Sequence, residues 1–300
     1  MNQRGACLAI DAQRGATKNI NQKEDVRPMF SRLKNLIAGG SKAAPVAHDG
    51  AVAYTGRSSV KPRHILCILG GDRDLQPLRE AANAAIAKFA TGFSIDEAYS
   101  QAEPDQQMSR SFSVCWDRVE PDAWTTADEE AVRRHQSVLY VVGPRMAQDD
   151  AVAVSIGALF LIDWLIKAGA VAVKGESAGV AHGLHRWREL IGMGAAAMEH
   201  DHGLAQSRVC RWAFAKRPLS SGNYLESVGF HLAGLPDVHV PQSRGSEREI
   251  VAIMDDVADE IVKQGIDAAL RAYDARLIDD RSYEQDDFKF NPYGIVKLDS

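Results

Sequence analysis

The chain has 300 residues, of which 45% are apolar and 25% are charged, and its formal net charge is −5. These proportions are those of an average globular protein, so neither a disordered nor a fibrous chain is indicated. Residues 1–62 carry ten Lys and Arg against four Asp and Glu, which gives this segment a net charge of +6. Residues 63–300 carry 25 Lys and Arg against 36 Asp and Glu, which gives them a net charge of −11. Because nucleic-acid binders normally show a basic patch, this acidic body predicts no nucleic-acid partner.

The first 62 residues are predicted to be a flexible leader and linker that precedes the fold. Residues 1–28 have few large apolar side chains and lack the apolar core of a signal peptide. Within residues 29–38 the apolar side chains share one helical face beside basic residues, which predicts a short amphipathic helix. Met29 resembles a natural start, which would make residues 1–28 an upstream extension. Residues 43–62 are rich in Gly, Ala and Ser, as linkers are.

The cysteines indicate a reducing compartment. They lie far apart and form no C-x-x-C pair: Cys7, Cys67, Cys115 and Cys210. Three fall within apolar runs, which is typical of reduced, buried thiols in a cytosolic protein. We therefore expect a cytoplasmic location. The most apolar run is shorter than the ~20 residues that a membrane span needs, so no transmembrane segment is predicted. The sequence leaves the oligomeric state open.

From residue 63 onward, apolar strand-like runs alternate with helical patterns, which predicts a single α/β (α+β) domain over residues 63–300. The expected strands are His64–Leu69, Ser111–Trp116, Ser137–Val142, Ala170–Val173, Arg208–Ala215, Asp237–Pro241 and a final hairpin or edge strand in Phe288–Leu298. Their order suggests a mixed sheet with ferredoxin-like βαββαβ elements, extended by further strands and helices.

Helices are expected between these strands. The first is capped by Asp72 or Asp74, and the second covers residues 127–134. The third begins after Asp149 or Asp150 and ends at Lys167. The fourth begins at Ser220 or Ser221 and runs to Leu232, and the last begins at Ser246 and ends at Gly265. Ser246 and Glu249 match a capping box. Asp163 and Lys167 are four residues apart, so they can pair on the surface of the apolar third helix.

A tight glycine turn follows the expected strand Ala170–Val173. Its sequence, Gly175-Glu176-Ser177-Ala178-Gly179, matches the G-x-S-x-G nucleophile elbow of serine hydrolases. Asp237 and His239 follow in the chain order of a triad acid and base, and His231 is a further candidate base. No H-G-G-type oxyanion loop precedes Ser177, however. The favoured interpretation is that Ser177 caps a following helix and that the two glycines permit the turn.

Neither a metal nor a cofactor is predicted. His182 and His185 are three apart on an expected helix and could face one ion, but no third ligand accompanies them. Glu199, His200, Asp201 and His202 are adjacent, so few of them could share an ion, and a solvated turn is expected. Gly70-Gly71-Asp72 follows a strand but lacks the Lys-Ser/Thr of a phosphate loop.

Three segments resemble landmarks of bacterial domain-of-unknown-function family 4261. They are K-G-E-S-A-G-V-A-H from Lys174, Y-L-E-S-V-G-F-H-L-A-G-L-P-D-V-H-V-P from Tyr224, and N-P-Y-G-I-V-K-L from Asn291. The resemblance spans roughly residues 63–300. It implies a cytosolic bacterial α/β protein without an established activity, and a protein-binding or immunity role near secreted-toxin systems.

We therefore expect a non-catalytic protein-binding domain with a protein partner, and we keep a serine hydrolase as the alternative. The candidate catalytic residues are Ser177, His239 and Asp237, and the candidate binding residues are Gly175, Glu176, Ser177, Gly179 and His182.

Overall fold

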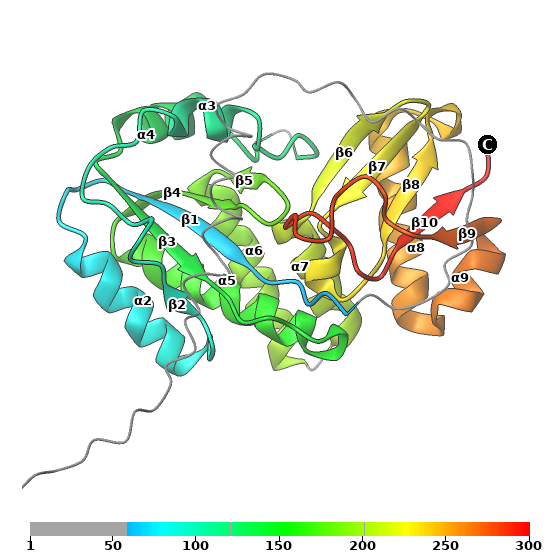
Figure 1. Cartoon of the computed structure of the whole chain (residues 1–300), viewed down its shortest axis with the longest axis horizontal. Helices are drawn as coiled ribbons and strands as arrows, with labels where there is room; N and C mark the ends of the chain where they lie inside the picture. The colour runs from blue at the N-terminus through cyan, green and yellow to red at the C-terminus, as the bar shows by residue number, and fades with distance from the viewer. Residues whose placement is uncertain (1–58, 121, 201) are drawn as a thin grey trace, which may run out of the picture.

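The computed structural model describes residues 59–120, 122–200 and 202–300. The amphipathic helix predicted within 29–38, the proposed start at Met29 and Cys7 lie outside the described residues. Within them the chain forms two five-stranded sheets with helices packed against both (Figure 1). The predicted α/β class is confirmed, and its ferredoxin-like detail stays a prediction.

The first sheet is antiparallel throughout, in the order β2-β3-β1-β4-β5. Its strands are β1 (Ile65–Gly70), β2 (Ser94–Ile95), β3 (Ser137–Val142), β4 (Ala170–Gly175) and β5 (Val180–His182). Both faces are covered, because alternate residues of β1 enter two different cores: Leu66 and Ile68 face one, Ile65 and Cys67 the other. Burial on both faces explains why the longer strands are continuous apolar runs.

The helices divide between the two faces of this sheet, as Figure 1 shows. One core is built with α2 (Gln76–Lys88), α5 (Ala151–Lys167), α6 (Leu184–Glu199) and α7 (Gly203–Phe214), and the opposite core with α3 (Met108–Ser113) and α4 (Thr126–Arg134). The apolar helix α5 carries the predicted ion pair, with Lys167 Nζ 2.5 Å from Asp163 Oδ2. In the described part of the chain, no helix combines the length and the apolarity needed to cross a membrane.

The second sheet has the order β6-β7-β8-β10-β9, and β8 and β10 are its parallel pair. The strands are β6 (Lys216–Ser221), β7 (Tyr224–Val228), β8 (Asp237–Pro241), β9 (Ala275–Ile278) and β10 (Ile295–Leu298), and α8 (Glu247–Gln264) and α9 (Ile266–Ala272) pack on one face. Short 3-10 helices are η1 (Gln148–Asp150), η2 (Phe230–Ala233) and η3 (Gln242–Arg244). Val238 and Val240 lie in this core, so the alternation of a strand places His239 on the opposite face.

Ion pairs join the two halves across α7 and α8. Arg211 is fully buried and donates to Asp259 Oδ1 over 2.6 Å, while Arg208 Nε donates to Asp259 Oδ2 over 2.6 Å. At the start of β6, Arg217 donates to Asp255 Oδ1 at 2.5 Å. An interior charge without its partner would cost several kcal/mol, so these pairs strongly favour one orientation of α7 on α8.

Two predicted strands are helices instead. Ser111–Trp116 alternates in polarity, but its first three residues belong to α3, which ends at Ser113, and a turn follows the helix. Arg208–Ala215 lies almost entirely in α7, where Val209, Cys210 and Ala213 are buried together. The spacing of these three residues fits one face of a helix as well as a short strand. The aromatic and branched residues of the segment favoured the two-residue period of a strand, which is wrong here.

Three further expectations need correction. The helix predicted from Ser220 to Leu232 is the β6–β7 hairpin followed by η2, because Gly222 at a φ of +58° lets the chain reverse. β10 lies inside its sheet, between β8 and β9, and is no edge strand. The aspartates proposed to cap α5 make no capping hydrogen bond with that helix. Asp74 Oδ1, in contrast, accepts from the amide of Gln76, the first residue of α2, over 2.9 Å, as predicted for a cap, and the capping box of Ser246 and Glu249 is confirmed.

Candidate functional site

The predicted glycine turn joins β4 to β5. Gly179 N donates to Gly175 O over 3.0 Å, and Glu176 N donates to the Ile65 carbonyl over 2.8 Å. Gly179 has a φ of +70°, a conformation that other residues rarely adopt. The turn is therefore as predicted, but the helix expected directly after it is wrong: the chain enters β5, and α6 begins only at Leu184.

The turn packs closely against the second sheet. Gly229 follows β7 with a φ of +116°, and a Cβ at this position would lie 2.6 Å from the Ala178 Cβ and 2.9 Å from the Phe214 carbonyl oxygen. No side chain fits in that space. The 175–179 turn thus sits at the junction of the two sheets.

The Ser177 hydroxyl is buried and bonded to the backbone. Ser177 is 1% exposed, its Oγ donates to the Arg63 carbonyl over 2.8 Å, and it accepts from Ile65 N over 2.9 Å. Ser177 is not a helix cap, because a strand follows it. Among the described residues, no imidazole lies within hydrogen-bond distance of this hydroxyl. Its observed role is to hold the turn on the start of β1.

Ser177→Ala should lower stability without affecting any esterase activity. The change leaves the Arg63 carbonyl and the Ile65 amide without their partner, which costs about 1–3 kcal/mol in the free energy of unfolding. Urea unfolding measures this cost, with the exposed Ser109→Ala as control. A fluorophosphonate probe should leave Ser177 of the wild type unlabelled. A fluorophosphonate adduct on Ser177 would contradict the structural role.

Neither candidate base lies at Ser177. His239 lies on β8 with its Nε2 2.8 Å from the Glu226 Oε2 on β7, a pair that the strand register sets directly opposite each other. His231 is fully buried in η2. Burial lowers the pKa of His231 to about 4, so this imidazole stays neutral at physiological pH. The structure does not bring His239 or His231 to Ser177.

Asp237, the candidate acid, is a buried connection between segments. Its Oδ1 accepts from Ser227 Oγ over 2.9 Å and from Phe230 N over 3.1 Å, and its Oδ2 accepts from Asn291 Nδ2 over 2.7 Å. Burial raises the pKa of Asp237 to about 7, although the hydrogen bonds from Asn291, Phe230 and Ser227 act against that rise. One carboxyl group thus joins β7, η2 and the chain before β10.

Asp237→Asn should change the pH dependence of stability. A folded pKa of about 7, above the ordinary 3.8, means that the folded state holds an extra proton between these values. The contribution of Asp237 to the free energy of unfolding therefore falls as pH rises through this window, by up to about 1.4 kcal/mol per pH unit. The variant should lack that slope.

Urea unfolding from pH 4 to pH 8 compares the two slopes. The buried His64 and His231 titrate in both proteins and cancel in the comparison. The exposed Asp267→Asn on α9 serves as control and should match the wild type. Parallel curves for wild type and Asp237→Asn would contradict a raised pKa at Asp237.

A buried ion pair next to the turn was missed by sequence analysis. Lys174 Nζ lies 2.9 Å from Glu176 Oε1, and the two side chains are 0% and 3% exposed. Lys174 also donates to Ser111 Oγ and lies 5.0 Å from the centre of the Phe112 ring. The signal in the sequence is the K-x-E spacing, which puts both side chains on one face of an extended chain.

The surroundings keep this pair charged and closed to solvent. Burial lowers the pKa of Lys174, but the Glu176 carboxylate and the Cys115 and Cys67 thiols together outweigh it, so the pKa is raised overall. Burial also raises the pKa of the Cys67 thiol to about 12. Protonated, bonded and fully buried, Lys174 is unsuited to act on a substrate and stabilises the sheet instead.

Glu176→Gln should be strongly destabilising, because it leaves the Lys174 charge buried without its carboxylate. We expect a loss of about 3–5 kcal/mol in the free energy of unfolding. Lys174→Met combined with Glu176→Gln removes both charges and should cost less than Glu176→Gln alone. Urea unfolding of the three proteins tests this order. Equal stability of the single and double variants would contradict a charged Lys174–Glu176 pair.

The two histidines proposed as a metal pair are separated. His182 lies on β5 rather than on a helix and is fully buried, with its Nε2 3.0 Å from the Ala213 carbonyl and its Nδ1 3.4 Å from Asp117 Oδ2. Burial lowers the pKa of His182, and Asp117 opposes the shift. His185 is 79% exposed on α6. Within the described residues, no group of three or more His, Cys, Asp or Glu could hold a metal ion.

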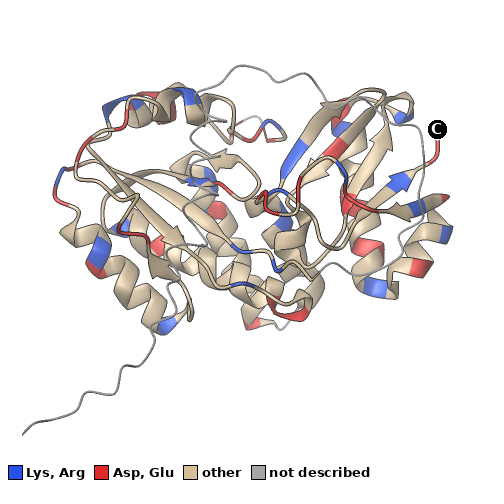
Figure 2. Ribbon diagram, viewed as in Figure 1, with Lys and Arg blue, Asp and Glu red and all other residues tan. Residues whose placement is uncertain are grey.

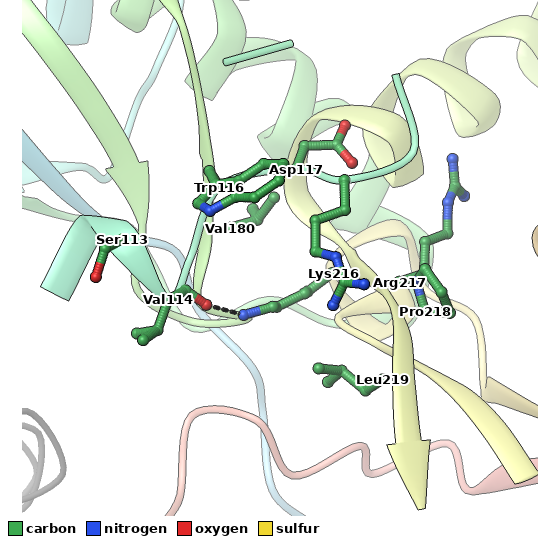
Figure 3. Close-up of a pocket in the computed structure, with 10 residues that line it drawn as sticks. Ser113, Val114, Trp116, Asp117, Val180, Lys216, Arg217, Pro218 and Leu219 are labelled. Atoms are coloured by element: carbon green, nitrogen blue, oxygen red, sulfur yellow. Dashed lines mark hydrogen bonds between the residues drawn. The ribbon is translucent and has the colours of Figure 1, made fainter. Parts of the chain in front are cut away.

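A cleft of about 510 Å³ lies between edge strands of the two sheets (Figure 3). β5 is an edge of the first sheet and β6 an edge of the second, and the chain after α3 supplies the remaining side. Its lining consists of Ser113, Val114, Trp116, Asp117, Arg118, Val180, Lys216, Arg217, Pro218 and Leu219.

Backbone pairing holds the rim of this cleft in place. Trp116 forms a parallel bridge with Ala181 of β5, Ala181 N donates to the Cys115 carbonyl over 2.7 Å, and Asp117 N donates to the Ala181 carbonyl over 2.8 Å. Val114 and Trp116 are 64% and 37% exposed, among the few large apolar side chains left at the surface of the described residues. The rim is therefore apolar and rigid.

The base of the cleft is positively charged. Figure 2 shows basic residues at the start of β6, and in Figure 3 the Lys216 ammonium donates to the Val114 carbonyl across the cleft. Burial lowers the pKa of Lys216. The Cys115 thiol opposes this shift, and the cations Lys289 and Arg118 add to it. Such a site can bind an apolar group beside an anion.

Comparison of this chain with models of known protein families, with curated proteins and with solved structures gives no match. The resemblance to family 4261 therefore stays a prediction.

Proposed function

We propose that this chain is a non-catalytic protein-binding domain and that the cleft between β5 and β6 is its docking site. The observation that carries the proposal is the exposure of Val114 and Trp116 on the rim. Apolar side chains that stay exposed beside a concave surface are typical of protein interfaces, and tryptophan is enriched among residues that dominate binding energy.

The rigidity of the rim also supports docking. Trp116 is held by the backbone pairs of its neighbours with Ala181, so a partner would pay little conformational entropy to order it. Pro218 and Leu219 face this rim from β6 and provide apolar surface on the opposite side. A partner segment placed between them would contact apolar groups on both sides. An immunity-type role, which the family resemblance implies, would be one case of such binding.

The geometry favours binding over ester hydrolysis. A nucleophilic serine needs an accessible hydroxyl and a base within about 3 Å. Ser177 instead is 1% exposed and uses its hydroxyl as donor and acceptor to the backbone of Arg63 and Ile65. The cleft lining includes Val180, which directly follows the turn, but not Ser177 itself. The hydrolase alternative therefore has no specific observation in its favour.

Peptide display against the purified protein tests the proposal. Peptides selected on the wild type should bind Trp116→Ala and Val114→Asp at least about ten-fold more weakly in fluorescence polarisation, because both changes remove apolar contact area from the rim. Met193→Asp, which alters an exposed apolar residue on α6, is the matched control and should bind as the wild type does. Selected peptides that bind all four proteins equally would place docking elsewhere.

A further inference from the structure

Lys216 is a partly buried cation without a carboxylate partner. Its Nζ donates to the carbonyl oxygen of Val114, and among the described residues no carboxylate oxygen lies within 4.0 Å of it. Taking an ammonium group out of water is costly unless an anion compensates for the lost hydration. A lone carbonyl provides only part of that compensation. The cleft therefore holds a charge for which the described residues supply no counterion.

Other cations surround Lys216. Arg118 and Lys289 lie close enough to repel its charge and depress its pKa, as does the buried Lys174. Lys289 Cε lies 3.8 Å from the position that a Cβ on Gly179 would take, which places this side chain over the 175–179 turn. The positive potential thus comes from three separate elements: β6, the chain after α3 and the chain before β10.

The nearby acidic groups do not neutralise this cluster. Asp117 lines the cleft, but its carboxylate is not within 4.0 Å of Lys216 Nζ. Glu247 lies 3.5 Å from Arg118, and because both side chains are more than half exposed, water screens that pair. Asp255 is engaged with Arg217. The lining of the cleft carries three cations, Arg118, Lys216 and Arg217, against the single carboxylate of Asp117, although residues 63–300 as a whole are acidic.

We infer that the docking segment of the partner is acidic: an Asp or Glu carboxylate binds Lys216 at the base of the cleft while a neighbouring apolar side chain contacts Trp116. This inference rests on the proposed protein-binding function and specifies its ligand. The inference rests on charge complementarity, since a carboxylate supplies the counterion that the described residues do not provide for Lys216, in a cleft that Arg118 also lines.

A carboxylate fits this site better than a phosphate does. Phosphates in proteins are commonly held by arginine forks that donate two parallel hydrogen bonds. Of the two arginines in the lining, Arg217 is engaged with Asp255 and Arg118 is exposed beside Glu247. Asp117 would repel a dianion more strongly than a single negative charge. Lysine, a compact point charge, suits one carboxylate oxygen.

The experiment uses a peptide that carries one acidic residue and one apolar residue, chosen from the display selection. Three versions are compared on the full chain by fluorescence polarisation: the Glu peptide, its Gln analogue and its phosphoserine analogue. Lys216→Met removes the charge and keeps much of the side-chain length. Lys263→Met, an exposed lysine on α8, is the matched control. Thermal melting verifies that each variant is folded, and Lys216→Arg is used in addition because it keeps the charge.

The Glu peptide should bind about ten-fold more tightly than the Gln analogue on the wild type, and Lys216→Met should remove this difference while Lys263→Met keeps it. Binding of the Glu peptide should also weaken as salt rises. If the Glu and Gln peptides bind with equal affinity and Trp116→Ala still weakens binding, the inference of an acidic ligand is overturned and the proposed docking function stands. If Trp116→Ala is harmless as well, the proposed function fails too. Tighter binding of the phosphoserine analogue would identify a phosphorylated partner and overturn the choice of carboxylate.

Discussion

The contact between the 175–179 turn and Gly229 determines how the two halves of the molecule meet. The Ala178 methyl occupies the space that a side chain on residue 229 would need, and the Phe214 carbonyl closes that space from the other side. Ser177 fixes the same turn to the start of β1. One tight turn therefore contacts an early strand, the end of α7 and the end of β7. The cleft depends on this arrangement, because Val180 and Lys216 each follow directly from one of these elements.

The buried charges on α7 and α8 add a second constraint on the same junction. Hydrophobic contacts tolerate small rotations, since apolar surface packs in many ways, but Arg211 and Asp259 must meet at hydrogen-bond distance. Asp237 acts similarly in the second half, where its carboxylate collects donors from Ser227 and Asn291. The residues that resemble family landmarks are thus found at structural junctions. Packing and hydrogen bonding hold Ser177, Gly229 and Asp237 at these junctions.

The strands that are buried on both faces could be predicted from the sequence. A continuous apolar run such as Ser137–Val142 forms either a buried strand or part of a core helix, and its short length favours the strand. The capping box of Ser246 and Glu249 could also be predicted, because both of its hydrogen bonds form within four consecutive residues. Short amphipathic segments were misjudged. In Arg208–Ala215 the identity of the neighbouring element decides which face is buried, and that information is tertiary.

The candidate site was only partly predictable. The turn at Gly175 and Gly179 follows from local chemistry, but Trp116 and Lys216 are 100 residues apart and meet only after both sheets have formed. In sequence, Lys216-Arg217 looks like an ordinary charged pair before a proline. Nothing local distinguishes Arg217, which is buried and paired with Asp255, from Lys216, for which the described residues provide no carboxylate within 4.0 Å. The Lys174–Glu176 pair was recognisable in spacing, but its burial was not, because lysines are rarely fully buried.

The proline in β6 limits the ways in which another chain can approach the cleft. An edge strand normally exposes a row of amides and carbonyls that can recruit an additional strand, and this is how many sheets aggregate. β6 carries Pro218 in its interior, so one amide donor is missing, and charged residues stand before it. Pairing along the full strand is thereby interrupted. A segment docked as proposed above would therefore be recognised mainly through its side chains rather than through its backbone.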